Sequence, residues 1–250
     1  MKIAVISDVH ANLPALEATM DDINKRKADK IICLGDLIGK GPSSKQTIDI
    51  CKNNCYIVIQ GNWDDGIFSA NEEIKQNMKS DFTERNRWYI ADAGQENVAY
   101  LGSLPHSAEM MLSNKLIRFF HAHPINFNRY FEHSPIEQRL ELFGFNENSC
   151  IKQKSDVAIY ADIHTAYMQS IDKRILLNVG SVGNPLDITQ ASYVMLEGSE
   201  VKKDSPLNIQ FIRVPYDIQK AVKMARESDM PDIEGYVEEI TTARYFKRGQ

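Results

Sequence analysis

Six side chains that could bind a metal ion each follow a short apolar segment of the sequence. They are Asp8, His10, Asp36, Asn62, His121 and His164. Carboxylates, imidazoles and a carboxamide without thiolates suit Mn, Fe, Zn or Co, whereas a closed structural zinc site is usually rich in cysteine. The two aspartates and three histidines are enough for two ions that share a bridging carboxylate. Such a pair binds both oxygens of an in-line displacement at phosphorus and lowers the pKa of a bound water.

Each of these residues also has a purely structural explanation. An aspartate that follows a strand is often the N-cap of a helix, and Asn62 after Gly61 fits a turn. An isolated histidine is more often a hydrogen-bonded loop residue than a metal ligand. The structural explanations would have to coincide at five strand ends, so the recurrence favours one shared metal site.

The apolar pattern predicts the elements that would position these side chains. Strand and helix alternate over Lys2–Ser7, Leu13–Lys27, Lys30–Leu34, Ser43–Lys52 and Tyr56–Ile59. The short β-branched runs indicate buried parallel strands, and the longer segments have helical spacing of apolar residues. Ligands of such a βαβαβ unit gather beyond the carboxyl ends of its strands, where Asp8, Asp36 and Asn62 stand.

The rest of the chain follows a different pattern. Residues 66–104 are polar and helical, and we expect them to form a cap or insertion within a single domain that spans residues 1–250. Further strands are predicted at Ala108–Leu112, Leu116–Phe120, Asp156–Tyr160, Tyr167–Ile171, Arg174–Val179, Ser192–Glu197 and Asn208–Val214. An amphipathic helix is predicted at Asp217–Arg226. His121 and His164 come shortly after two of these strands.

Composition and charge narrow the class of protein. With 43% hydrophobic residues the chain can build a sizeable core, and its formal net charge of −5 argues against binding a nucleic-acid polymer. A small phosphorylated or nucleotide substrate remains compatible, because bound metal ions would supply positive charge. No apolar run approaches the roughly 20 residues of a membrane helix, and no signal peptide is apparent, so we expect a cytoplasmic protein. The four cysteines predict no disulfide framework, and the oligomeric state is open.

Taken in order, the chemistry-bearing residues form five motifs. They are Asp8-Val9-His10, Gly35-Asp36-Leu37-Ile38, Gly61-Asn62-Trp63-Asp64, His121 and Ala161-Asp162-Ile163-His164. In these motifs the chain resembles the calcineurin-like metallophosphoesterases, from its first residue to about Met230. The segments Gly35–Pro42, Asn178–Pro185 and Ala191–Tyr193 are similar to those of small bacterial and archaeal phosphodiesterases. Trp63 is similar to its counterpart in bacterial enzymes that cleave diadenosine tetraphosphate asymmetrically.

The resemblance implies a four-layer α/β/β/α sandwich of two mixed sheets and a site for two divalent ions. The first ion would be held by Asp8, His10, Asp36 and His164, and the second by Asp36, Asn62, His121 and Asp162. Mn or Fe is expected, with Zn, Ni and Co as alternatives. A hydroxide that bridges the ions would attack phosphorus in line, while the metals and Asn62 stabilise the developing charge.

Two positions depart from the family pattern. Position 162, usually histidine, is Asp162, whose carboxylate reaches as far from Cβ as imidazole Nδ1; we expect a retained ligand, with a weakened second metal site as the alternative. Trp63 replaces a histidine that would protonate the leaving oxygen. Loss of a general acid, typically worth ~10²–10⁴-fold, favours phosphoanhydrides and activated diesters over alkyl monoesters. The indole is a candidate for stacking on a nucleobase or for a hydrophobic wall of the pocket.

Three further residues are candidates for contact with substrate. His123 is a candidate substitute acid or phosphate contact, or else a residue that orients the site by a hydrogen bond. Arg85 and Arg87 would contact substrate from the helical region, or else belong to a solvated cap. We therefore predict a dinuclear metal-dependent phosphoesterase acting on phosphodiesters or dinucleoside polyphosphates. The alternatives are a degenerate nucleotide-binding protein with an impaired second metal site, and a phosphomonoesterase.

Overall fold

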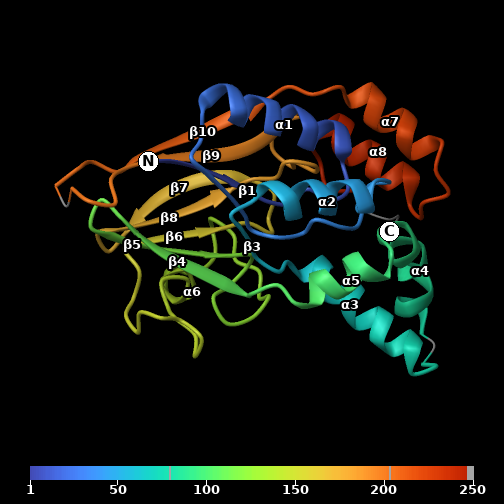
Figure 1. Ribbon diagram of the computed structural model, residues 1–250, viewed down its shortest axis with the longest axis horizontal. Helices are drawn as coiled ribbons and strands as arrows, with labels where there is room; N and C mark the ends of the chain where they lie inside the picture. Colours follow the sequence, from blue (N-terminus) through green and yellow to red (C-terminus); the bar gives the residue numbers. More distant parts are fainter. Residues whose placement is uncertain (79, 203, 247–250) are drawn as a thin grey trace.

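Two mixed sheets of five strands face each other in the computed structural model, which describes residues 1–78, 80–202 and 204–246 (Figure 1). The first sheet has the order β10-β9-β1-β2-β3, at Asn208–Val214, Ala191–Glu197, Lys2–Ile6, Lys30–Cys33 and Ile57–Val58. The second has the order β4-β5-β6-β8-β7, at Ser107–Leu112, Lys115–Phe120, Val157–Tyr160, Arg174–Val179 and Ala166–Ile171. Strands β1 to β3 run parallel, as do β5, β6 and β8. The predicted pair of mixed sheets flanked by helices is confirmed.

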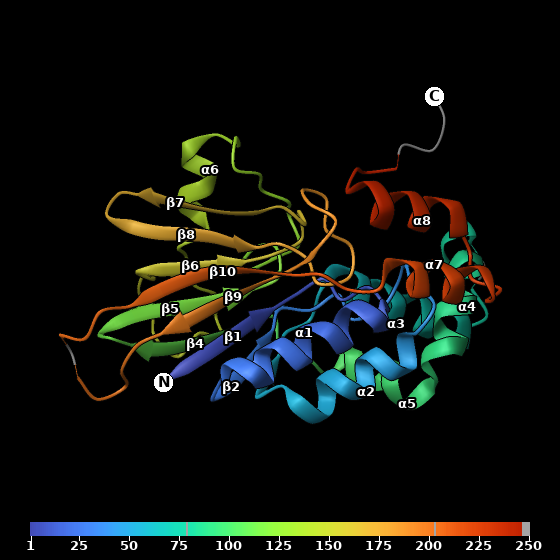
Figure 2. The same cartoon turned by 90° about the horizontal axis from the view of Figure 1, so that it is seen from above.

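The pleat of β1 shows how both faces of the first sheet are filled. Ile3 and Val5 belong to the core between the sheets, whereas Ala4 and Ile6 belong to a second core shared with the helices. Helices α1 (Leu13–Arg26) and α2 (Ser44–Asn54) lie along that outer face (Figure 2). Burial on both faces explains why β1 and β2 are continuous apolar runs in the sequence.

The outer face of the second sheet is covered by a short helix and a long loop. Helix α6 (Ile136–Glu141) leads into this loop, and Phe143 packs with Phe120 and Tyr160 of the sheet. Arg118 of β5 is fully buried on the same face, and its guanidinium donates to backbone carbonyls of Phe143, Gly144, Ile151 and Gln153. One buried side chain thus ties both ends of the loop to the sheet.

Two groups of helices lie at the end of the sheets where β1 and β2 finish (Figures 1 and 2). The first group comprises α3 (Asn62–Lys75), α4 (Asp81–Ala93) and α5 (Gln95–Gly102). The second comprises α7 (Ile218–Arg226) and α8 (Ile233–Thr242), which share a small apolar core that includes Tyr236 and Ile240. Helix α8 was not predicted from the sequence. No helix in the described part of the chain is long and apolar enough to cross a membrane.

Candidate metal centre and active site

The predicted metal ligands lie where strands of the two sheets end. Asp8 and His10 follow β1, Asp36 follows β2, Asn62 begins α3 after β3, His121 follows β5, and Asp162 and His164 follow β6. We call the six residues Asp8, His10, Asp36, Asn62, His121 and His164 the ligand cluster. The structure brings these six side chains together at one edge of the sandwich, although they are spread over more than 150 residues of sequence.

Four residues of the ligand cluster and the neighbouring Asp162 adopt a left-handed backbone conformation, which is rare for residues other than glycine. The φ angles are 51° at Asp8, 46° at His10, 54° at Asp36, 68° at Asp162 and 59° at His164. Each left-handed residue costs roughly 1–3 kcal/mol and persists only where its surroundings impose it. Hydrogen bonds between the loops do so here, since Asp8 N donates to Gly35 O at 3.0 Å and His10 N to Asp36 O at 2.9 Å.

Asp8 places one carboxylate oxygen among three imidazole rings. Its Oδ1 is buried and accepts no hydrogen bond from the described residues. The Nε2 atoms of His164, His10 and His121 lie 3.3, 3.8 and 4.0 Å from this oxygen. Burial opposes ionisation of Asp8, but the three imidazoles outweigh it and hold the pKa of this carboxyl below its usual range. A buried acceptor without a donor, surrounded by ring nitrogens, fits a cation.

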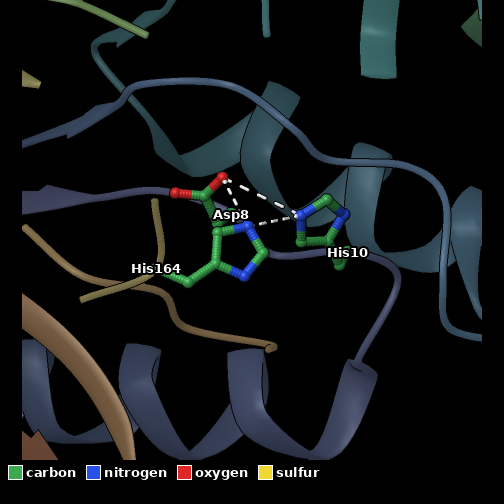
Figure 3. Close-up of side chains that lie close together, drawn as sticks. All are labelled: Asp8, His10 and His164. Carbon is green, nitrogen blue, oxygen red and sulfur yellow. Dashed lines mark hydrogen bonds and ion pairs between the residues drawn. The ribbon is translucent and has the colours of Figure 1, made fainter. Parts of the chain in front are cut away.

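His10 and His164 both direct Nε2 toward the space beside Asp8 (Figure 3). Their Nδ1 atoms face backbone carbonyls, that of Ile38 at 3.2 Å and that of Asn184 at 2.6 Å. Because a carbonyl only accepts, each Nδ1 carries the proton, and each Nε2 presents a lone pair. The two Nε2 atoms are only 3.1 Å apart. Two facing lone pairs held by their outer hydrogen bonds are the arrangement expected of imidazoles that share a metal.

Asp36 lies between His10 and His121, two histidines of the ligand cluster. Its Oδ1 accepts the Trp63 N–H at 2.8 Å, and its Oδ2 is 3.5 Å from Nε2 of both His10 and His121. Gly61 allows this fit, since a Cβ atom there would be 2.1 Å from Asp36 Oδ1. Burial raises the pKa of Asp36 well above its usual range. One oxygen is thus anchored, and the other is equidistant from the two imidazoles.

His121 and Asn62 form the far side of the ligand cluster. His121 Nδ1 donates to Leu34 O at 2.8 Å, and its Nε2 lies 2.9 Å from Asn62 Oδ1. Burial disfavours the charged ring, but the carboxylates of Asp36 and Asp8 outweigh burial and raise the pKa of His121 to about 9. The carboxylates of Asp36 and Asp8 therefore create a negative electrostatic potential around His121, and this potential favours a positive charge beside His121 and Asn62.

Asp64 connects the two loops that carry Asp36 and Asn62. Its carboxylate is fully buried and accepts three backbone N–H groups, those of Asp36 at 2.8 Å, Leu37 at 3.0 Å and Gly61 at 2.9 Å. These bonds fix the two loops relative to each other. The aspartate of the Gly-Asn-Trp-Asp motif is therefore a structural residue of the site.

We expect Asp64→Ala to lower the free energy of unfolding by about 3 kcal/mol or more, because a buried donor left without a partner costs roughly 1–3 kcal/mol. Urea denaturation measures this loss. Asp65→Ala, which removes the neighbouring and partly exposed carboxylate, is the matched control and should lose less than about 1 kcal/mol. Equal losses in the two variants would contradict the role of Asp64.

Asp162, expected to be a ligand of the second ion, has a different partner in the structure. Its Oδ2 is 2.7 Å from Arg129 Nε and its Oδ1 is 2.8 Å from Arg129 Nη2. Oδ1 is also 3.9 Å from His121 Nε2, so the carboxylate stands beside the ligand cluster. It belongs to neither of the two groups whose ligand atoms lie within 4.8 Å of one another. The geometry therefore does not support Asp162 as a metal ligand.

His123, a candidate acid or phosphate contact, lies in the loop that follows β5. The His123 side chain is 7% exposed and is not among the residues that line the cavity next to Asp36 and His164. Its Nδ1 accepts the Ile125 N–H at 3.2 Å, and its ring stacks on Tyr130 with centroids 5.4 Å apart. Although His123 is two residues from His121, the chain has left β5 by then and the ring packs within its own loop.

A cavity of about 1050 Å³ opens above the ligand cluster. Asp36 and His164 contribute to its lining, and Trp63, Arg85 and Tyr236 contribute from α3, α4 and α8. Trp63 packs its ring against the loop at Gly39, where a Cβ atom would be 2.1 Å from indole Cε3. Its centroid is 5.8 Å from that of His10 in a T-shaped contact. This position makes Trp63 a wall of the cavity beside the ligand cluster.

The two arginines of the helical region differ in position. Arg85 lines the cavity, as expected of a substrate contact. Arg87 does not, because its Nε pairs with Glu84 at 2.9 Å and the pair is exposed to solvent. The structure therefore does not bring Arg87 to the site. Residues two positions apart on a helix point to different sides, so Arg85 of α4 faces the cavity while Arg87 faces solvent.

Two polar residues of the site, Lys40 and Asn184, belong to the segments Gly35–Pro42 and Asn178–Pro185. Lys40 Nζ donates to Asn184 Oδ1 and to Glu239 Oε2, each at 2.7 Å. Asn184 also holds His164 through its carbonyl. Lys40 thus links a ligand-bearing loop to α8. A third residue, Arg129, carries no sequence signal, since its loop has neither a motif nor a periodic pattern.

Comparisons with known proteins agree with this geometry. Residues 1–200 match the model of the calcineurin-like phosphoesterase superfamily domain. An uncharacterized protein of Methanocaldococcus jannaschii is 30% identical over 245 residues, which cover 92% of this chain and 94% of that protein.

Two solved structures share the fold. A metallophosphoesterase from Sphaerobacter thermophilus has a TM-score of 0.75 and 24% identity, with 97% of this chain and 100% of that chain covered. A hypothetical protein from Pyrococcus horikoshii has a TM-score of 0.73 and 17% identity, with 99% of each chain covered. The chain belongs to the calcineurin-like phosphoesterase superfamily and is a hydrolase that acts on phosphate esters.

Proposed function

We propose that this chain is a dinuclear metal-dependent phosphodiesterase that cleaves phosphodiesters or phosphoanhydrides, including dinucleoside polyphosphates. The observation that carries the proposal is the position of Asp36 Oδ2, 3.5 Å from Nε2 of both His10 and His121. A carboxylate oxygen placed evenly between two groups of ligands is what two neighbouring ions require of a bridging residue.

The residues divide into two sets of ligands. The first set would comprise Asp8, His10, Asp36 and His164, and the second Asp36, Asn62 and His121, with Asp8 close to both. Carboxylate, imidazole and carboxamide donors fit Mn or Fe, and Zn, Ni and Co are alternatives. Bound divalent ions would supply Lewis-acid activation of water and of the phosphate.

The chain itself holds these ligands in place. Backbone carbonyls of Ile38, Leu34 and Asn184 orient the three imidazoles, and the N–H of Trp63 fixes one oxygen of Asp36. Ligands held in this way need little reorganisation when a phosphate arrives, which is how preorganised sites lower a barrier. In this proposal the carboxamide of Asn62 stabilises the charge that develops on the phosphate oxygens.

The choice of substrate follows from the lining of the cavity. Trp63 stands beside His10 and cannot transfer a proton, and burial raises the pKa of Tyr236 well above its usual range. Neither residue is therefore a good acid for a leaving oxygen. Leaving groups that depart without protonation, such as a nucleotide phosphate or a nitrophenolate, suit this site. Its volume and aromatic walls also accommodate a nucleoside.

We expect the Mn²⁺-loaded chain to carry two metal equivalents and to hydrolyse bis-p-nitrophenyl phosphate faster than p-nitrophenyl phosphate. Elemental analysis gives the metal content, and absorbance of nitrophenolate gives both rates. Faster cleavage of the monoester would indicate a phosphomonoesterase. Affinity for nucleotides without turnover of either compound would indicate a binding protein, and either outcome would overturn the proposal.

A further inference from the structure

We infer that Arg129 binds the phosphate of the substrate and that Asp162 positions Arg129 instead of ligating a metal. The inference rests on the proposed function, because it assigns a phosphate contact within the same site. Both residues line the cavity together with Asp36 and His164. Arg129 is a substrate-binding residue in this assignment, and Asp162 acts through it.

The geometry of the ion pair leaves part of the guanidinium available. Asp162 engages Nε and Nη2 of Arg129 at 2.7 and 2.8 Å, which is a two-point pair. No described residue accepts a hydrogen bond from Nη1. The Asp162 side chain is 3% exposed, whereas that of Arg129 is 49% exposed. The carboxylate is thus buried at the base of the pair, and the free end of the guanidinium is open to the cavity.

The pair is placed beside the ligand cluster by Asp162. The Asp162 N–H donates to Asp8 Oδ2 at 3.3 Å, and Asp162 Oδ1 is 3.9 Å from His121 Nε2. An isolated carboxylate at this point would add a third negative charge next to Asp8 and Asp36. The guanidinium cancels that charge, so the pair is net neutral and keeps unpaired N–H groups on a side chain that lines the cavity.

Arg129 is held by its own loop as well as by Asp162. The carbonyl of the next residue, Tyr130, accepts the hydroxyl of Tyr160 at 2.9 Å. The Tyr130 ring stacks on His123, and its hydroxyl donates to Glu141 at 3.2 Å. A guanidinium on a loop anchored at three points loses little conformational entropy on binding. These contacts also give His123 a function, which is to support the residue next to Arg129.

A guanidinium in this setting suits a phosphate in particular. Its planar N–H groups match the spacing of phosphate oxygens, and the group stays charged at every physiological pH. The burial and two-point pairing of Asp162 suit a carboxylate that orients a neighbour. A metal ligand would keep at least one oxygen free for the ion, whereas both oxygens of Asp162 accept hydrogen bonds from Arg129.

The test compares Arg129→Met, Asp162→Asn and the double variant in the Mn²⁺-loaded protein. Inorganic phosphate is the probe, with its Kd from calorimetry, the metal content from elemental analysis, and KM and kcat from bis-p-nitrophenyl phosphate. We expect Arg129→Met to weaken phosphate binding about 10- to 100-fold, the loss typical of charge-assisted hydrogen bonds. Metal content should not change, and KM should rise more than kcat falls. Arg129→Lys should recover only part of the affinity, because it keeps the charge and loses the fork.

The double variant separates positioning from metal ligation. If Asp162 acts through Arg129, Asp162→Asn weakens phosphate binding without losing metal, and the double variant is no weaker than Arg129→Met alone. Arg26→Met is the matched control, because Arg26 pairs with Asp22 on the exposed face of α1. Loss of one metal equivalent in Asp162→Asn but not in Arg129→Met would overturn the inference, as would unchanged phosphate affinity in Arg129→Met. Phosphate and metal binding are measured without turnover, so an inactive wild type that binds both would refute only the proposed function.

Discussion

Replacing Asp36 by asparagine should abolish hydrolysis and leave the fold intact. In the wild type, Asp36 Oδ1 accepts the Trp63 N–H at 2.8 Å. The side-chain carbonyl oxygen of asparagine can accept the same hydrogen bond. The amide nitrogen would replace Oδ2, the oxygen that lies 3.5 Å from Nε2 of His10 and of His121. An NH₂ group cannot ligate a cation, so both groups of ligands lose their shared residue. We expect the loss in kcat/KM to exceed the roughly 10–100-fold typical of residues that only orient a ligand.

The kinetic test of Asp36→Asn uses bis-p-nitrophenyl phosphate, with metal content measured on the same samples. Circular dichroism and thermal unfolding establish that the fold is retained. Asp21→Asn is the matched control, because Asp21 is exposed on α1 and its removal should leave turnover unchanged. Normal turnover by the metal-loaded Asp36→Asn variant would refute the assignment of the site.

The positions of the principal ligands could be predicted because the strands that carry them are buried on both faces. A strand such as β1 is then a short apolar run that stops at its carboxyl end, and a polar residue there is conspicuous. Asp8, Asp36 and His121 stand out in this way. The sheet order could not be read from the sequence, but any order that makes β1 and β2 parallel neighbours brings Asp8 and Asp36 together. His121 joins them because the second sheet, which contains β5, packs against the first.

Other features of the site depend on contacts that leave no local pattern. Asp162 is separated by 33 residues from Arg129, and neither the motif around position 162 nor the loop around position 129 indicates the pair. The proximity of His123 to His121 in the sequence suggested a shared site, but outside a regular strand two residues of separation do not fix a direction. The left-handed φ angles of Asp8 and Asp36 could not be predicted from the sequence either, because the surrounding structure imposes them and the residue type does not.

Helix α8 was missed for a different reason. It is short, it lies beyond the last recognisable motif, and its burial rests on packing with α7. Tyr236 and Glu239 nevertheless reach the cavity, and Glu239 pairs with Lys40 at 2.7 Å. The cavity is thus completed by residues of α8, which explains why the ligand cluster was easier to predict than the walls around it.

Removal of metal should abolish hydrolysis and markedly destabilise the protein. Without a cation, the Nε2 lone pairs of His10 and His164 face each other at 3.1 Å and Asp8 Oδ1 stays buried without a donor. A cation that binds only the folded state relieves both conflicts and adds about 2.7 kcal/mol at 100 times its Kd. The melting temperature should therefore rise with Mn²⁺ concentration and fall again with EDTA.

The destabilisation can be assigned to the ligand cluster by substitution. His10→Gln removes one of the facing ring nitrogens, so this variant should lose most of the Mn²⁺-dependent rise in melting temperature together with its activity. His133→Gln is the control, since its side chain is 77% exposed and it should respond to Mn²⁺ as the wild type does. A melting temperature independent of Mn²⁺ and EDTA in the wild type would show that no cation binds. A rise that persists in His10→Gln would place the bound cation elsewhere, because the facing pair of imidazoles is the feature that makes the folded, metal-free site unfavourable.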